Sequence, residues 1–129
     1  MSLKAEITQI LTTDPSILSM VPATSIMYAA GEDNYPRSVD YIVFDARVAG
    51  VTNVYDTKEL IDEYSVTVQV VSLDAVRADN ISQAVRDALL EFRSSNILNI
   101  YFERSNEVWN PDDKAITLSN DFTAVYCKN

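Results

Sequence analysis

The clearest pattern of apolar and polar positions runs from residue 64 to residue 92. Apolar and polar side chains alternate from Tyr64 to Val71, and this period of two predicts a strand with one buried face. From Asp74 to Phe92 the apolar positions recur every three or four residues, which predicts an amphipathic helix that Ser72 or Asp74 can cap. Its apolar stripe is Ala78, Ile81, Ala84, Val85, Ala88, Leu89 and Phe92. The alanines allow close approach to a sheet, so we expect the strand and the helix to pack together.

The segments before this pair predict two short helices and two strands. Residues 2–12 have apolar side chains at helical spacing, and Asp14 followed by Pro15 is a start signal for a further turn or two over residues 15–20. Ser25 to Ala29 has strand character, and the turn-rich residues 30–38 predict a loop. The apolar run that begins at Tyr41 and continues to residue 50 predicts a central strand.

The polar segment Val51 to Lys58 separates this strand from the one that begins at Glu59. Two long strands on either side of a short polar connection predict a long β-hairpin. The register of its second strand is well specified, because a slip of one residue would expose the valines.

After the long helix, Ser94 to Asn96 predict its end, with Asn96 as the expected left-handed residue. Ile97 to Phe102 predicts a short strand, which the polar residues 103–107 follow. Residues 110–113, Asn-Pro-Asp-Asp, predict a turn. Ala115 to Cys127 predicts a final strand with alternating apolar positions, where Asn120 interrupts the apolar face and is the expected site of a bulge.

These elements predict one α+β domain over residues 1–129. We expect a mostly antiparallel sheet of about four to five strands with a long helix and a short N-terminal helix packed on it. A chain of this length can bury roughly two-thirds of the surface of its unfolded form, enough for one core.

The formal net charge of −9 limits the kinds of partner that the chain can bind. The ten basic residues are scattered, so an attractive footprint for sequence-specific nucleic-acid binding is missing. Such a surface suits either plain solubility or the wall of a conduit that DNA passes without adhering. The single cysteine, Cys127, permits no internal disulfide. No stretch resembles a signal peptide or a membrane span, so we expect synthesis in the cytoplasm and no membrane association.

The residue inventory argues against catalysis and cofactors. There is no histidine, which removes the commonest general base and the usual zinc ligand. Gly31 and Gly50 are the only glycines, so no phosphate-binding or dinucleotide loop can be written into the chain. The carboxylate pair Asp112 and Asp113 is explained by its turn, and Glu32 and Asp33 are typical of a solvated loop. We therefore predict no catalytic, cofactor or metal site.

The candidates for contact with partner proteins lie on loops and at a turn. Tyr55 is an aromatic side chain in the hairpin connection, and Trp109 precedes the Asn-Pro turn; aromatic residues are enriched in interface cores. The expected set is Thr52, Asn53, Tyr55, Asp56, Lys58, Glu32, Asp33 and Trp109.

The order of elements resembles the phage tail completion or tail terminator family, the head-tail joining proteins of long-tailed phages. The resemblance rests on the helix from Leu3 onward, the "YIVF" strand at Tyr41 to Phe44, the strand at Val66 to Val70 and the helix segment Ala84 to Leu89. The closing strand, with Asp121 to Val125, is also similar. The loop before the "YIVF" strand departs from the family pattern, because Pro36 lies five residues before the strand instead of beside it.

The resemblance implies a structural protein that caps the head-proximal end of the tail tube as a ring, usually of six copies, and joins the tail to the head connector. Its implied partners are further copies of itself, the tail tube protein and a connector or stopper protein, with DNA passing through the lumen. Its place would be the neck region of the virion tail. We expect the hairpin tip, Thr52 to Lys58, to contact other subunits or the tube. Another neck or tail component, such as a head-closure or tube protein, and a small-molecule-binding regulatory module are the alternatives.

Overall fold

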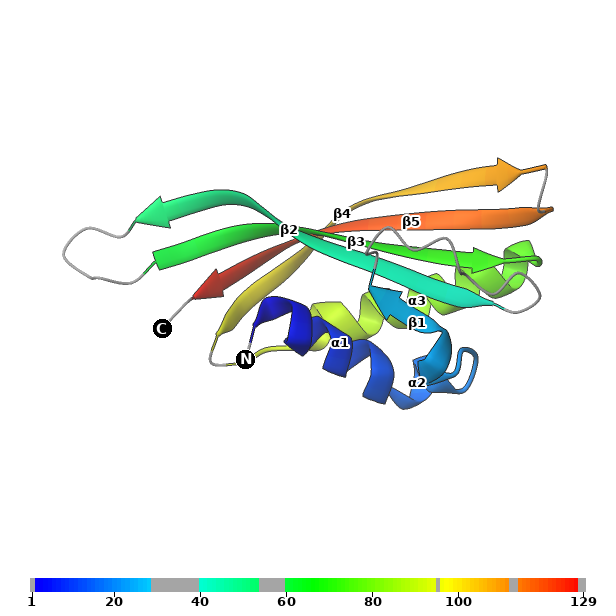
Figure 1. The fold of residues 1–129 in the computed structure, drawn as a ribbon, viewed down its shortest axis with the longest axis horizontal. Helices are drawn as coiled ribbons and strands as arrows, with labels where there is room; N and C mark the ends of the chain where they lie inside the picture. Colours follow the sequence, from blue (N-terminus) through cyan, green and yellow to red (C-terminus); the bar gives the residue numbers. More distant parts are fainter. Residues whose placement is uncertain (1, 29–39, 54–59, 95, 112–113, 128–129) are drawn as a thin grey trace.

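The structure, a computed structural model, describes residues 2–28, 40–53, 60–94, 96–111 and 114–127. Within these ranges the chain forms three α-helices, one short 3-10 helix and five strands (Figure 1). In chain order they are α1 (Leu3–Thr13), α2 (Pro15–Leu18), η1 (Ala23–Ser25), β1 (Ile26–Tyr28), β2 (Tyr41–Asn53), β3 (Leu60–Ser72), α3 (Ala75–Glu91), β4 (Ile97–Asn110) and β5 (Ala115–Cys127).

The strands form one sheet in the order β1-β2-β3-β5-β4. β1 runs parallel to β2, and the other neighbouring strands are antiparallel. β2 and β3 form the predicted long hairpin, paired from Tyr41 with Val71 to Asn53 with Leu60. The predicted α+β class, with a mostly antiparallel sheet, is confirmed. β2 extends further than predicted, because residues 51–53, expected in the polar connection, still pair with β3.

The helices cover one face of the sheet (Figure 1). α3 packs on β3, β4 and β5, while α1 packs on α3, β1 and β2. Among the described residues no helix covers the opposite face. For the part of the chain that the structure describes, one face of the sheet is therefore part of the core and the other face carries no helix.

Side-chain caps explain where the helices begin. The Ser2 hydroxyl accepts a hydrogen bond from the Ala5 amide (3.1 Å) at the start of α1. The Asp14 carboxylate accepts the first free amides of α2 at 2.9 and 3.1 Å, and Asp74 accepts the Val76 amide at 2.9 Å at the start of α3. The predicted caps at Asp14 and Asp74 are thus confirmed, because each carboxylate satisfies amides that lack an intrahelical partner.

The core lies between the helices and the alternating positions of the strands. Every second residue of β3, namely Val66, Val68 and Val70, is fully buried. The α3 residues that face them include Ile81, Val85 and Leu89, also fully buried. The predicted strand-and-helix pair is therefore the centre of the core, since each of the two elements covers the apolar surface of the other.

The second half of β4 differs from the prediction. A short strand ending at Phe102 and a polar segment 103–107 were expected, but β4 is one strand of 14 residues. Its pairing with β5 continues through Glu107 with Leu118 to Asn110 with Ala115. The prediction failed because both faces of this half are exposed, so backbone pairing holds the strand without any apolar alternation.

Asn120 does not form the expected bulge. β5 pairs with β3 in an unbroken register through Asn120, and the irregularity lies in β4, between Phe102 and Arg104. Asn120 is fully buried; its amide nitrogen donates to the Val68 carbonyl (3.3 Å) and to the Ser82 hydroxyl (3.2 Å). A polar residue interrupts the apolar face here because it finds hydrogen-bond acceptors on β3 and α3.

The end of α3 also differs from the prediction. The helix ends at Glu91, and its C-cap residue Phe92 has an extended backbone (φ −78°, ψ 137°), so the helix does not end through a left-handed turn at Asn96. The Asn96 side chain instead donates to the Cys127 carbonyl (2.8 Å) and so joins the start of β4 to the end of β5.

Candidate functional site

The interface residues predicted at the β2–β3 hairpin lie at its far end. Thr52 and Asn53 are the last two residues of β2, paired with Ile61 and Leu60. The other hairpin and loop residues predicted for an interface lie outside the described residues: Tyr55, Asp56, Lys58, Glu32 and Asp33.

Trp109 lies at the opposite end of the sheet from Thr52 and Asn53. It pairs with Ile116 near the end of β4, and its side chain is 55% exposed. Figure 1 shows the β2–β3 hairpin reaching one end of the molecule and the β4–β5 hairpin reaching the other. The predicted interface residues that the structure describes therefore form two separate surfaces. Thr52 and Asn53 belong to one end of the sheet, and Trp109 belongs to the other.

β4 is an edge strand, and its outer backbone groups face no other strand among the described residues. Residues 103–109 are exposed along their whole length. Four large apolar side chains of this strand are about half exposed: Leu98, Tyr101, Val108 and Trp109. β4 contains no proline or lysine, but it carries the charged residues Glu103, Arg104 and Glu107 and has register irregularities at Ile97/Asn99 and Phe102/Arg104, features that partly protect a strand edge. The half-exposed apolar side chains beside them are typical of a surface that another chain covers.

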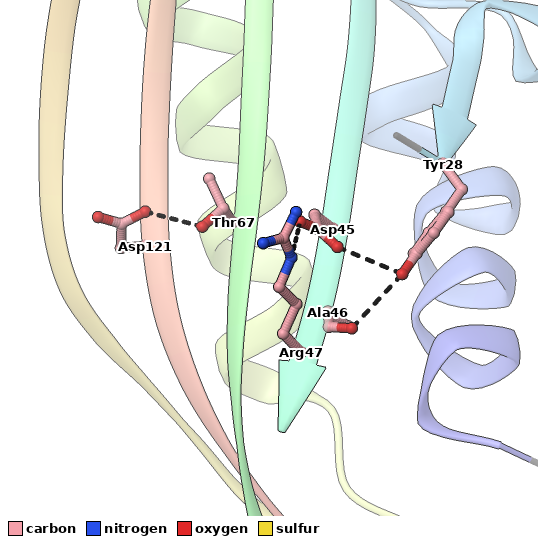
Figure 2. A network of polar contacts seen from close by, with 6 residues as sticks. All are labelled: Tyr28, Asp45, Ala46, Arg47, Thr67 and Asp121. Carbon is pink, nitrogen blue, oxygen red and sulfur yellow. Dashed lines mark hydrogen bonds and ion pairs between the residues drawn. The ribbon is translucent and has the colours of Figure 1, made fainter. Parts of the chain in front are cut away.

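The helix-free face of the sheet carries polar side chains on β2, β3 and β5, while Tyr101 and Val108 lie at its β4 edge. Figure 2 shows Asp45 and Arg47 on β2, Thr67 on β3 and Asp121 on β5 in front of the sheet, with the helices behind it. The Arg47 guanidinium donates to Asp45 (2.7 Å), which also accepts from the Tyr28 hydroxyl (3.2 Å).

Asp121 holds a second polar cluster on this face. It accepts hydrogen bonds from the Thr67 hydroxyl (3.1 Å) and from the Arg104 guanidinium (2.9 Å). Both arginines of the face, Arg47 and Arg104, thus have their charge balanced by a carboxylate of the same chain. The face offers hydroxyl and carboxylate groups but no uncompensated cation among the described residues.

A groove of about 410 Å³ lies between α1 and α3. Its lining residues are Glu6, Gln9, Ile10, Thr13, Asp14, Ala88, Glu91 and Phe92. Three of them are carboxylates, and none is a base. Glu6 is only 8% exposed, and its Oε2 atom is buried without a hydrogen-bond partner among the described residues.

Two side chains have displaced pKa values. Burial raises the pKa of Tyr126, and the charge of Glu6 raises it further, because both disfavour the phenolate. The hydrogen bond and the charge of Asp40 raise the pKa of Arg77. Arg77 also donates to the Met20 carbonyl (2.8 Å), so it joins α3 to the segment before β1 and to the start of β2.

The described residues contain no cluster of three or more histidine, cysteine, aspartate or glutamate side chains placed to hold a metal ion. Within the same ranges no helix is long and apolar enough to cross a membrane. The surface that these residues form includes an edge strand, a sheet face without helices and an acidic groove.

Sequence reasoning missed Glu6 and the β4 edge. Glu6 could have been found, because it is three residues from Leu3 and four from Ile10 and so falls inside the apolar stripe of α1. The β4 edge could not, since the order of strands in a sheet is not visible in a single sequence.

Comparison with known proteins agrees with this architecture. The structure is similar to a chain of the "Virion of native gene transfer agent (GTA) particle", with a TM-score of 0.73, 18% sequence identity and coverage of 98% of this chain and 95% of that chain. At this identity the likeness concerns the fold. No curated protein sequence matches the chain. The family model described as tail completion protein gp17 matches residues 5–127, nearly the whole chain, and the protein therefore belongs to the tail completion protein gp17 family.

Proposed function

We propose that this protein is a structural component of a phage tail that forms a ring at the head-proximal end of the tail tube and joins the tail to the head connector. Family membership supports a role in tail completion. Six copies in the ring and a position in the neck follow from the family resemblance. The role needs no catalysis, cofactor or metal.

The observation that carries the proposal is the open edge of β4. A ring requires a heterologous contact, in which one surface of a copy meets a different surface of the next copy. β4 supplies the first of these surfaces, with an outer edge that no described strand pairs and the half-exposed side chains of Tyr101, Val108 and Trp109. Burial of these apolar side chains would favour association, and the strand edge can pair with a strand of the next copy.

The polar helix-free face suits the wall of a DNA conduit. Proteins that bind DNA neutralise phosphates with free arginine and lysine side chains. On this face Arg47 and Arg104 are already paired with Asp45 and Asp121, and the whole chain carries a net charge of −9. We therefore place this face toward the lumen, where DNA slides past without adhering.

The two ends of the sheet are the proposed contacts with other proteins. At one end lie Thr52 and Asn53, and we assign the segment Thr52 to Lys58 to contact with a neighbouring subunit or the tube. At the other lies Trp109 on the β4–β5 hairpin. We also assign the loop residues Glu32 and Asp33 to contacts with other proteins. The separation of the two ends suits a protein that joins two assemblies.

The substitution Val108→Lys tests the proposed ring contact. The Val108 side chain is 50% exposed, so lysine is accommodated without loss of the fold but places a charge in the contact. We expect a phage carrying this variant to produce at least about tenfold fewer joined head-tail particles, counted by electron microscopy, because a loss of about 1.4 kcal/mol weakens one contact tenfold and a ring repeats the contact. A shortened hairpin between residues 52 and 58 should act in the same direction.

Val76→Lys is the matched control, because Val76 is 69% exposed and belongs to α3, not to the β4 edge. It should leave the particle count unchanged, and circular dichroism should show both variants folded. Equal counts for Val108→Lys and the wild type would refute the role of the β4 edge.

A further inference from the structure

Glu6 is a buried carboxylate that the fold does not satisfy. Its side chain is 8% exposed on the inner side of α1, among Leu3, Ile7 and Ile10, and its Oε2 atom accepts no hydrogen bond from a described residue. Buried charges in proteins are normally paired or hydrogen-bonded, because removing a carboxylate from water is costly. Glu6 therefore calls for an explanation beyond the isolated chain.

The position of Glu6 in the first turn of α1 compensates only part of this cost. The positive end of the helix dipole favours a negative charge there. That interaction is small compared with the cost of burying a carboxylate oxygen without a partner. A solvent-facing acid in the same turn would gain the same dipole interaction without the burial, so the dipole does not account for the burial of Glu6.

The groove between α1 and α3 places Glu6 within reach of a ligand. Asp14 and Glu91 add two further carboxylates to its wall, while Ile10, Ala88 and Phe92 add apolar surface. This combination matches the side chain of arginine or lysine, which has an apolar stem and a cationic head. A groove of about 410 Å³ is large enough for one such side chain and a flanking residue.

We propose that this groove binds an arginine or lysine side chain presented by a partner protein of the assembled tail, and that Glu6 recognises the cationic group. From the groove, the guanidinium or ammonium group would donate to the Glu6 carboxylate, and the apolar stem would lie on Phe92 and Ala88. Asp14 and Glu91 would attract the cation from the rim. The burial of Glu6 then has a use, since a charge kept out of water binds its partner more strongly.

The charge of the chain favours a basic partner over a second copy. With a net charge of −9, two copies repel each other at an acidic groove. Two exposed arginines, Arg47 and Arg104, are each engaged by a carboxylate of their own chain, and Arg93 donates to the Leu90 and Phe92 carbonyls. Lys4, the base nearest to Glu6 along α1, lies over the ring of Tyr28 at 3.8 Å.

The experiment uses the full-length chain, two capped tripeptides, Leu-Arg-Leu and Leu-Gln-Leu, and the variants Glu6→Gln and Glu91→Gln. Nuclear magnetic resonance titration should show saturable shifts of the Gln9, Ala88 and Glu91 amides with the arginine peptide only. Glu6→Gln should weaken this binding about tenfold, as expected for one charge-assisted hydrogen bond. Glu91→Gln removes an exposed carboxylate of the same groove and should weaken it less than about threefold.

The thermal midpoint of Glu6→Gln separates a binding role from a structural one. Removal of an unsatisfied buried charge should leave the midpoint unchanged or raise it. A lower midpoint would mean that Glu6 stabilises the isolated fold, and this would overturn the proposal. Three other outcomes would also overturn the proposal. They are no saturable binding up to about 10 mM peptide, equal binding of the arginine and glutamine peptides, and equal effects of Glu6→Gln and Glu91→Gln on binding.

The inference that the partner is a tail protein rests on the proposed function. The peptide titration tests binding in the groove and does not depend on that function. If sedimentation shows that the chain self-associates and that Glu6→Gln abolishes the association, a second copy occupies the groove and the partner proposal fails. The Val108→Lys particle count tests the ring independently, because Val108 lies on β4 and does not line the groove.

Discussion

Replacement of Asn120 by leucine is the most informative test of how the sheet and α3 are held together. Asn120 is the polar residue of β5 that is fully buried on the core side. Its amide nitrogen donates to the Val68 carbonyl on β3 and to the Ser82 hydroxyl on α3, at 3.3 and 3.2 Å. Its Oδ1 atom is buried without a partner among the described residues.

The expected magnitude follows from these contacts. Two neutral hydrogen bonds longer than the usual 2.9–3.0 Å contribute about 0.5 kcal/mol each, near the low end of the range. Removal of the unsatisfied Oδ1 returns about 1–3 kcal/mol. The Ser82 hydroxyl freed by the change can donate to a carbonyl of the preceding turn of α3. Leucine has the same branching as asparagine but is larger, and its extra volume costs about 1 kcal/mol, the low end of the range for overpacking.

We therefore expect Asn120→Leu to change the unfolding free energy by between about −1 and +1 kcal/mol, that is, to leave the stability nearly unchanged. Urea unfolding followed by circular dichroism measures this directly, and the thermal midpoint should shift by no more than about 4 °C in either direction for a domain of this size. Asn120→Asp is the matched control; it should lose about 3 kcal/mol or more, because the carboxylate would be buried against the Val68 carbonyl.

A loss of more than about 1 kcal/mol in Asn120→Leu would refute the reasoning, since the two hydrogen bonds would then outweigh the unsatisfied oxygen. If the prediction holds, Asn120 contributes little to stability. Its main role is then to fix the register of β5 against β3 and the position of α3 on the sheet, as single buried polar residues do in other folds.

Two further predictions concern the cap of α3 and the buried tyrosine. Asp74→Ala removes the acceptor of the Val76 amide and should lower the unfolding free energy, measured by urea unfolding, by about 1 kcal/mol. The control Asp79→Ala, at an exposed position inside the same helix, should change the unfolding free energy by less than about 0.5 kcal/mol. Equal losses in the two variants would contradict the capping role of Asp74. Burial raises the pKa of Tyr126, so the folded state keeps the protonated hydroxyl more strongly than the unfolded state does. The stabilisation is complete below the unfolded pKa of about 10 and falls as the pH rises further. Tyr126→Phe should reduce the loss of stability between about pH 9 and pH 11 measured by urea unfolding, and an unchanged pH dependence would show that Tyr126 is not its source.

The sequence alone determined the elements whose side chains face a core. The alternation at Val66, Val68 and Val70 and the stripe on α3 are visible because burial imposes one period on a strand and another on a helix. The caps at Asp14 and Asp74 were predictable for a similar reason, since a local hydrogen bond to the first helical amides leaves a local sequence signal.

The tertiary structure decided everything that depends on which strands are neighbours. The second half of β4 is exposed on both faces, so its partner β5 and not its own residues makes it a strand. The role of Asn120 likewise depends on Val68 and Ser82, which are 52 and 38 residues away in the chain. Strand order also made β4 the open edge and brought α1 beside α3, where Glu6 lines a groove. Contacts between distant residues leave no period in a single sequence, and for this reason only the folded chain shows these surfaces.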